Sequence, residues 1–218
     1  MIAIVPKVIQ KLRAALCLGL VMLAGLVSAG TYEDLLQAVA DDNSAWLKDM
    51  VRDGADPNTV TRDGNSLLIL AVRDGKKNAF YALLESKAKV DLRNANGETA
   101  LMIAAIQGRT EMASKLVFAG AQIDFKGWNP LLYAATGGSD QVTKMLLDLG
   151  ANVNGVSDNG TTPLMMAVRG GHKATVKLLL ARGANPNLKN ERGETALAWA
   201  MDRGYTDIGT MLVDHGAQ

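Results

Sequence analysis

The segment that comes nearest to a catalytic motif is Gly170-Gly171-His172-Lys173-Ala174-Thr175. It contains the glycine, lysine and threonine with which a phosphate-binding loop holds a nucleotide. Such a loop also needs an earlier glycine at a fixed spacing, and that glycine is absent here. We therefore interpret the segment as a turn between two helices and predict no nucleotide site.

Other residues with chemical capability are few and scattered. Two histidines, His172 and His215, and one cysteine, Cys17, are too few for a histidine-rich metal centre. Ser139 has no histidine near it, so we interpret it as a helix cap and not as a nucleophile. Carboxylate pairs such as Asp41-Asp42 lie in expected turns, whereas acid–base catalysis needs a desolvated pair. The sequence predicts a protein that is not an enzyme and that needs neither a metal nor a cofactor.

Methionines could in principle serve as thioether ligands or as targets of oxidation. Met102, Met165 and Met166 recur at helical spacing among apolar residues. Methionine in such a pattern typically fills gaps in a hydrophobic core. We predict that these three side chains are buried.

Charge and composition narrow the classes of partner. The 218 residues include 23 Lys and Arg against 22 Asp and Glu, and the sequence pI is near 7.8. A balanced chain has no strong electrostatic attraction to nucleic acids or to an anionic membrane. With 48% hydrophobic and 21% charged residues the chain is expected to fold, and nucleic acid is an unfavoured partner.

The first thirty residues have the pattern of a secretory signal. Lys7, Lys11 and Arg13 precede an apolar run that ends in Val27-Ser28-Ala29, with small residues at the two positions that a signal peptidase reads. The apolar run is shorter than the ~20 residues that a membrane-spanning helix needs. We predict cleavage after Ala29 and a periplasmic or secreted protein with no membrane contact, the alternative being an uncleaved anchor.

The rest of the chain is an internal repeat. Six marks of the form Gly-Ala or Lys-Ala recur at intervals of 33, 33, 30, 33 and 33 residues, and a repeat of this length indicates a stack of small units. They are Gly54-Ala55, Lys87-Ala88, Gly120-Ala121, Gly150-Ala151, Gly183-Ala184 and Gly216-Ala217.

A second set of residues runs in phase with the first. Side chains suited to capping a helix precede apolar segments, two of which begin with Pro130 and Pro163, and each segment carries one alanine on its expected packing face. The predicted caps are Ser66, Thr99, Asn129, Thr162 and Thr195. The predicted packing residues are Ala71, Ala104, Ala134, Ala167 and Ala200.

These marks resemble the ankyrin-repeat family, whose 33-residue unit is a hairpin followed by two antiparallel helices. The resemblance covers residues 31–218 and implies an all-α repeat solenoid, with one domain over 30–218. We expect a monomer that is closed at both ends. The implied units are approximately 31–60, 61–93, 94–124, 125–156, 157–189 and 190–218.

The sequence departs from the family pattern in two ways. The family commonly has a histidine that ties hairpins together, and every matching residue here is apolar, so we expect few polar links and a stack held by burial at roughly 25 cal/mol per Å². The second departure is a hairpin shortened by three residues between Ala121 and Gly127, beside Phe125, Trp128 and Tyr133. The apolar residues at the histidine position are Ile69, Met102, Leu132, Met165 and Ala198.

The resemblance implies a module that binds a protein partner through a concave face of hairpins and inner helices. Two other roles stay open, an inhibitor of an exported toxin or enzyme and an accessory to a periplasmic oxidative-stress enzyme. Trp128 is either an exposed anchor or a plug that fills the shortened hairpin. The implied binding residues are Arg73, Asp74, Ile106, Gln107, Trp128, Tyr133, Arg169, Glu194 and Arg203.

Overall fold

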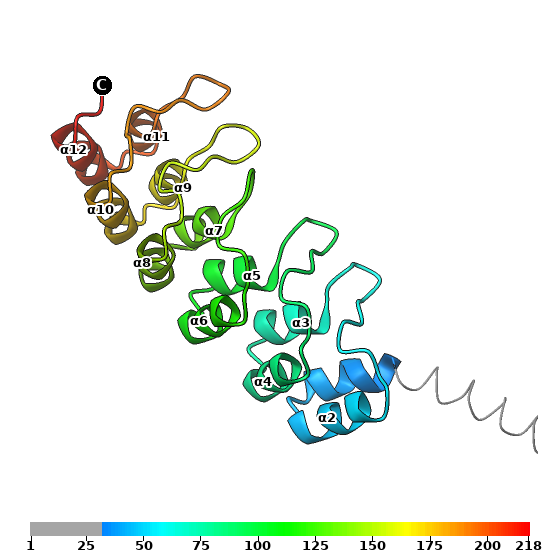
Figure 1. Cartoon of the computed structure of the whole chain (residues 1–218). Helices are drawn as coiled ribbons and strands as arrows, with labels where there is room; N and C mark the ends of the chain where they lie inside the picture. The colour runs from blue at the N-terminus through cyan, green and yellow to red at the C-terminus, as the bar shows by residue number, and fades with distance from the viewer. Residues whose placement is uncertain (1–31) are drawn as a thin grey trace, which may run out of the picture.

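The computed structural model describes residues 32–218, so the predicted leader and its cleavage site lie outside the described residues. The first helix pair comprises a helix over 32–40 and α2 (Ser44–Arg52). Five further pairs follow in a curved row (Figure 1). Their inner helices are α3 (Leu67–Arg73), α5 (Ala100–Ile106), α7 (Pro130–Gly137), α9 (Pro163–Arg169) and α11 (Ala196–Asp202). Their outer helices are α4 (Lys77–Glu85), α6 (Thr110–Phe118), α8 (Asp140–Asp148), α10 (Lys173–Ala181) and α12 (Thr206–Asp214).

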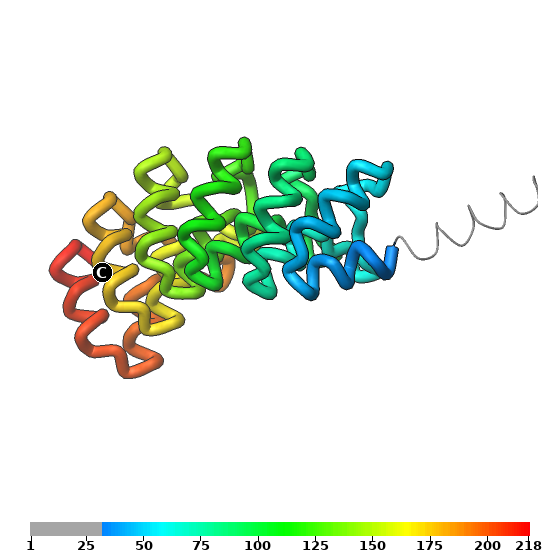
Figure 2. Tube along the Cα trace, turned by 90° about the horizontal axis from the view of Figure 1, so that it is seen from below, coloured from blue at the N-terminus to red at the C-terminus, as the bar shows by residue number. Residues whose placement is uncertain are grey.

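The pairs follow one another in chain order, and the row bends toward its C-terminal end (Figure 2). Between residues 32 and 218 the β pairing is limited to an isolated bridge between Val60 and Ser66. The all-α solenoid class is therefore confirmed.

The inner helices begin at the predicted caps. At each cap the side-chain oxygen accepts a hydrogen bond from the backbone N–H three residues later, and Pro130 and Pro163 lie in the first turn of α7 and α9. The prediction for Ser139 is confirmed in position, since Ser139 is the N-cap residue of α8, but not in hydrogen bonding. Ser139 does precede α8, but its side chain accepts no capping hydrogen bond, and the same is true of the residues that precede the other outer helices from α4 to α12.

The inner helices pack through the predicted small residues. All five alanines are fully buried. Met102, Met165 and Met166 are also buried, which confirms their role in the core. The sulfur of Met102 additionally accepts a hydrogen bond from the backbone N–H of Thr99 at 3.4 Å. Apolar burial therefore extends up to the polar helix caps.

The expectation of few polar links between hairpins is wrong. One Asn or Asp lies four residues after each of the first five marks, and its side-chain oxygen accepts a hydrogen bond of 2.7 to 3.2 Å from a backbone N–H of the next hairpin. These links do not need the family's histidine, because a short side chain in the hairpin itself reaches the neighbouring backbone. The five acceptors are Asn58, Asp91, Asp124, Asn154 and Asn187.

The shortened hairpin lies where neighbouring repeats approach most tightly. A Cβ on Gly137 would lie 2.0 Å from the carbonyl oxygen of Ile106, so only glycine lets α7 come this near to α5. On the other side, a Cβ on Gly127 would lie 2.6 Å from a carboxylate oxygen of Asp158 in the next hairpin. At Gly127 the shortened hairpin therefore lies in close contact with the next hairpin.

The expected closure fails at the C-terminal end of the described chain. In the first repeat the helix over 32–40 exposes Glu33, Asp34 and Gln37, which are polar. In the last repeat Met201 is 72% exposed and Val213 is 54% exposed. The last helices thus leave apolar side chains uncovered by any described repeat.

Thr143 on α8 tests the packing of the outer layer. Its hydroxyl is buried and has no hydrogen-bond partner in the described structure. Thr143→Val removes an unsatisfied polar group at nearly constant shape and should stabilise the protein by about 1 kcal/mol. Urea unfolding monitored by circular dichroism measures the change.

Thr175→Val on α10 is the matched control. The Thr175 hydroxyl is equally buried but donates to Asp140 Oδ1 at 2.5 Å. Its loss should destabilise the protein by about 1 kcal/mol, because Asp140 loses a donor. Equal effects of the two substitutions would contradict this account.

Candidate protein-binding surface

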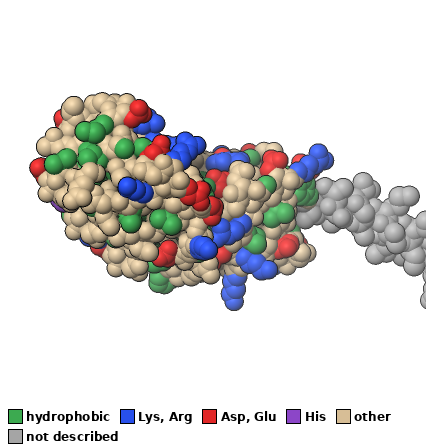
Figure 3. Space-filling view, turned by 90° about the horizontal axis from the view of Figure 1, so that it is seen from above, with side chains coloured by type: hydrophobic (Ala, Val, Ile, Leu, Met, Phe, Trp, Pro, Cys, Tyr) green, Lys and Arg blue, Asp and Glu red, His purple; other side chains and the backbone are tan. Residues whose placement is uncertain are grey.

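Hairpin tips and the C-terminal ends of the inner helices form one side of the array. Viewed from above, this side carries charged side chains of both signs over its middle, while hydrophobic side chains and uncharged surface occupy the end away from the grey atoms (Figure 3). The surface of interest therefore has mixed charge, as the balanced composition predicts.

Trp128 stands at the shortened hairpin and packs against a second aromatic ring. Its ring meets the Tyr133 ring edge to face, with centroids 5.8 Å apart and planes at 81°. The Tyr133 hydroxyl donates in turn to Glu98 Oε1 of the preceding repeat at 3.1 Å. Trp128 itself is 37% exposed, more than either of the other two tryptophans. The indole is thus oriented by a neighbour while much of it still faces solvent.

Two adjoining hollows extend from Trp128 toward the C-terminal end. The first has a volume of about 320 Å³ and runs from Trp128 to Trp199, and the second, of about 470 Å³, continues to Arg203. Side chains from the fourth, fifth and sixth repeats meet here. The residues that line both hollows are Arg169, Arg192, Glu194 and Trp199.

Glu194 holds the far wall of these hollows in place. Its Oε2 accepts hydrogen bonds from Asn190 Nδ2 at 2.8 Å and from Trp199 Nε1 at 3.0 Å. These two hydrogen bonds hold the pKa of Glu194 below its ordinary value. The carboxylate is therefore occupied as an acceptor, and the Trp199 ring is fixed by it.

The structure brings together about half of the residues that the sequence predicted for binding. Trp128, Arg169 and Glu194 line the first hollow and Arg203 lines the second, while Tyr133 supports Trp128 from the side. Because these residues come from three different repeats, only the stacking of the repeats brings them together.

The other predicted residues form a separate group on the second and third repeats. The Arg73 guanidinium lies 3.1 Å from Asp74 Oδ1, and Gln107 donates to the Arg73 carbonyl oxygen at 3.2 Å. Ile106 is partly buried at the end of α5. Figure 1 shows α7 between this group, which lies on α3 and α5, and α9. The predicted site is thus divided, and no hollow found in the described residues joins its two parts.

The prediction from sequence missed Trp199 and Arg192, which line both hollows. A signal for Trp199 was present. Tyr133 lies six residues after the hairpin glycine Gly127, and Trp199 lies six residues after Gly193. The two side chains therefore occupy the same place in their repeats. Arg192 lies on a hairpin tip, where charged residues are ordinary, and its sequence position offered no such signal.

Residues 32–218 contain neither a metal-binding cluster nor a membrane-spanning helix. No group of three or more His, Cys, Asp or Glu side chains in this range is arranged to hold a metal ion. No helix in this range is both long and apolar enough to span a bilayer. The hollows offer indole rings, guanidinium groups, carboxylates and amides as their contact groups.

Comparison with known proteins places this geometry in a family. The family model described as ankyrin repeats (3 copies) matches residues 35–126 and again residues 131–218. The chain belongs to the ankyrin-repeat family. The break between the two matches falls just after the shortened hairpin, beside Trp128.

Curated relatives share repeats with the chain and not their whole length. A stretch of 120 residues, 50% of the chain, is 38% identical to the B-cell lymphoma 3 protein homolog of Mus musculus and covers 27% of that protein. A stretch of 62 residues, 27% of the chain, is 44% identical to ankyrin repeat and KH domain-containing protein 1 of Homo sapiens and covers 2% of it. A stretch of 110 residues, 47% of the chain, is 29% identical to palmitoyltransferase AKR1 of Lachancea kluyveri and covers 15% of it.

Membership in the family supports a general role. Ankyrin repeats are protein–protein interaction modules and are typically not enzymatic, although a palmitoyltransferase is among the proteins that share them. The expected protein partner is therefore supported at the level of the family.

The Tyr133 hydroxyl reports on the packing beside Trp128. Burial, the charge of Glu98 and the hydrogen bond to Glu98 raise the pKa of Tyr133 from 10.0 to about 12. Between pH 10 and pH 12 the folded chain thus keeps the Tyr133 hydroxyl proton, which an unfolded chain loses. The stability contributed by Tyr133 should be fully present below pH 10 and should fall as the pH rises toward 12.

Ultraviolet titration of the tyrosines checks this expectation. Tyr133→Phe should remove the last phenolate to form, and Glu98→Gln should lower the pKa of Tyr133 because the repelling charge is gone. If Tyr133→Phe leaves the latest part of the titration unchanged, Tyr133 does not have the environment described.

Proposed function

We propose that this protein is a non-enzymatic, exported module that binds a partner protein through the two hollows between Trp128 and Arg203. The observation that carries the proposal is the meeting of Trp128, Trp199 and three arginines in one concave region built from three repeats. Tryptophan, tyrosine and arginine are the residue types that contribute most to the affinity of protein interfaces.

Three arginines line the hollows together with three carboxylates, those of Glu191, Glu194 and Asp202, so acidic groups can be received at the guanidinium side chains alone. None of Arg169, Arg192 and Arg203 forms an ion pair with a carboxylate in the described part of the chain, and Glu194 already accepts two hydrogen bonds. A partner that supplies carboxylates beside an apolar side chain would pair with the guanidinium groups and cover the indole rings. We propose a partner segment of that kind.

Export is supported by the sequence of the leader. The basic residues, the short apolar run and the small residues before Gly30 together match a cleavable secretory signal. We propose a bacterial protein that acts in the periplasm. The near neutrality of the chain is compatible with a protein partner in that compartment.

The first prediction from this proposal concerns the N-terminus. Expression of the full sequence in an exporting bacterium should give a periplasmic protein that begins at Gly30, as determined by N-terminal sequencing. A variant with Ala29→Asp should accumulate uncleaved, because the peptidase requires a small residue there. Recovery of Met1 in the membrane fraction from the unaltered sequence would contradict cleavage.

The second prediction concerns Trp128. Mature protein is used to capture a partner from periplasmic extract, and the affinity of the purified partner is then measured by titration calorimetry. Trp128→Ala should weaken binding by about 2 kcal/mol, and Arg169→Ala should weaken it by ~1 to 2 kcal/mol. Phe118→Ala is the control, since Phe118 is 90% exposed at the end of outer helix α6.

Stability measurements on the same variants separate the two interpretations of Trp128. If Trp128 is an anchor, Trp128→Ala should lower the affinity for the partner while the urea midpoint changes little. If Trp128 is a plug, the substitution should lower the stability while the affinity stays intact, and that result would move the binding site toward Arg73 and Asp74.

A further inference from the structure

Asn96, Asn154 and Asn159 are each followed directly by a glycine. The backbone nitrogen that follows an asparagine can attack the side-chain amide carbon and expel ammonia. A glycine in that place favours the attack, because it has no Cβ to obstruct it. The three asparagines share this local sequence, so any difference in their reactivity in the folded chain must come from the structure around them.

Asn96 and Asn159 occupy the same place in two hairpins. Each precedes a hairpin glycine with a positive φ, which is 77° at Gly97 and 75° at Gly160. In both turns the glycine N–H donates to the carbonyl oxygen three residues earlier at 2.9 Å. Both asparagines are exposed, so water reaches them. The backbone therefore gives no reason for the two to react at different rates.

The side chains of the two asparagines differ in their hydrogen bonds. Asn159 Oδ1 accepts from the Ser157 hydroxyl at 2.6 Å, from the Thr161 hydroxyl at 2.8 Å and from the Thr161 backbone N–H at 3.3 Å. The Asn96 side chain forms no hydrogen bond within residues 32–218, although its backbone N–H donates to Asn94 Oδ1. The Asn159 amide must break hydrogen bonds to rotate, and the Asn96 amide rotates without that cost.

Asn154 is held by the next repeat. Its Oδ1 accepts from the Asn185 backbone N–H at 2.8 Å, and its Nδ2 donates to the Gly183 carbonyl oxygen at 3.4 Å. Asn154 is also only partly exposed. Rotation of this amide would break a link between two hairpins, so Asn154 should react slowly as well.

A positive charge lies beside the turn that contains Asn96. Arg93 Nη1 donates to the Gly97 carbonyl oxygen at 2.9 Å, and the guanidinium is held 4.2 Å from the centre of the Phe125 ring. In the other hairpin Val156 stands at this place, and the matching carbonyl oxygen accepts no side-chain hydrogen bond within the described residues. Negative charge builds up as the backbone nitrogen loses its proton and attacks, so a neighbouring cation lowers the barrier.

We propose that Asn96 is a site of spontaneous modification, at which the Gly97 backbone nitrogen attacks the Asn96 amide carbon. A bond forms between this nitrogen and Cγ, and the bond from Cγ to the side-chain nitrogen breaks. Ammonia leaves with the proton that the backbone nitrogen gave up. Water then opens the cyclic imide at either of its carbonyl carbons and leaves an aspartate or an isoaspartate. Over both steps an amide and a water become a carboxylate and an ammonium ion, so the reaction needs neither an oxidant nor an enzyme.

The product alters the chain next to the residues that support Trp128. Isoaspartate adds a backbone carbon and a negative charge two residues before Glu98. The Glu98 backbone N–H donates to Asn94 Oδ1 at 2.9 Å, and its carboxylate accepts from the Tyr133 hydroxyl at 3.1 Å. The modification thus acts on the third hairpin and does not depend on the proposed partner.

Peptide mapping by mass spectrometry tests the proposal on the purified folded protein, kept in a mildly alkaline buffer made with isotopically labelled water. Asn96 should gain a carboxylate that carries the label. Its conversion should be about tenfold faster, or more, than that of Asn154 or Asn159, because those amides must first break hydrogen bonds. In urea the three asparagines should convert at similar rates, since the unfolded chain lacks these hydrogen bonds.

Substitutions test the two causes separately, with circular dichroism to confirm that each variant is folded. Thr161→Val removes one donor to Asn159 at nearly constant shape, so Asn159 should convert faster while Asn96 is unchanged. Arg93→Val should slow the conversion of Asn96 about threefold or more, and Arg93→Lys should restore part of the rate. Asn96→Gln is the control that should stop labelling at this position.

The proposal is overturned if Asn96 does not convert in the folded protein. It is equally overturned if Asn154 or Asn159 converts as fast as Asn96 there, because the hydrogen bonds would then not control the reaction. Unchanged conversion of Asn96 in Arg93→Val overturns the role assigned to the guanidinium.

Discussion

Neighbouring inner helices approach each other through alanine and glycine positions, and this close approach sets the arrangement of everything else. The five alanines from Ala71 to Ala200 are fully buried, and Gly137 has a carbonyl oxygen where a side chain would stand. A single helix pair cannot bury its own apolar face, so each repeat depends on the next to cover it. Because the contact is made by small side chains, the backbones are held at a nearly fixed separation.

The fixed separation gives the hairpins a common spacing, which their polar side chains exploit. A carbonyl or carboxylate oxygen such as that of Asp124 or Asn154 reaches the next hairpin's backbone only because the repeats lie one helix width apart. The same spacing brings Trp128, Arg169 and Trp199 from three repeats to one concave region. Stability and the candidate binding surface therefore depend on one contact between helices.

Features set by local spacing could be predicted from the sequence, and features set by contact with the next repeat could not. Caps such as Thr99, the first-turn Pro163 and the buried Met102 follow from residue type and periodicity alone. Asn58 and its counterparts recur with the same period, but the hydrogen bond that the Asn58 side chain accepts depends on the distance to the backbone N–H of Lys89. The sequence does not give that distance directly.

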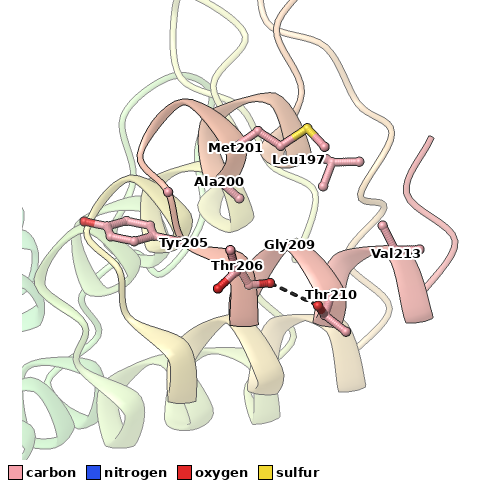
Figure 4. Close-up of a pocket in the computed structure, with 9 residues that line it drawn as sticks. Leu197, Ala200, Met201, Tyr205, Thr206, Gly209, Thr210 and Val213 are labelled. Carbon is pink, nitrogen blue, oxygen red and sulfur yellow. Dashed lines mark hydrogen bonds between the residues drawn. The ribbon is translucent and has the colours of Figure 1, made fainter.

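The candidate site shows the same division. The predictions for Trp128, Arg169, Glu194 and Arg203 placed four residues that the fold gathers, because all belong to the C-terminal three repeats. Arg73, Asp74 and Gln107 matched the family pattern equally well but lie outside that region. Helix α11 then separates two surfaces by its own periodicity, since Trp199 and Arg203 line the hollow while Leu197 and Met201 line a separate cleft formed with α12 (Figure 4). One helix therefore carries residues of the candidate site on one side and an apolar surface on another, and the spacing of the residues along the helix decides which residue belongs to which.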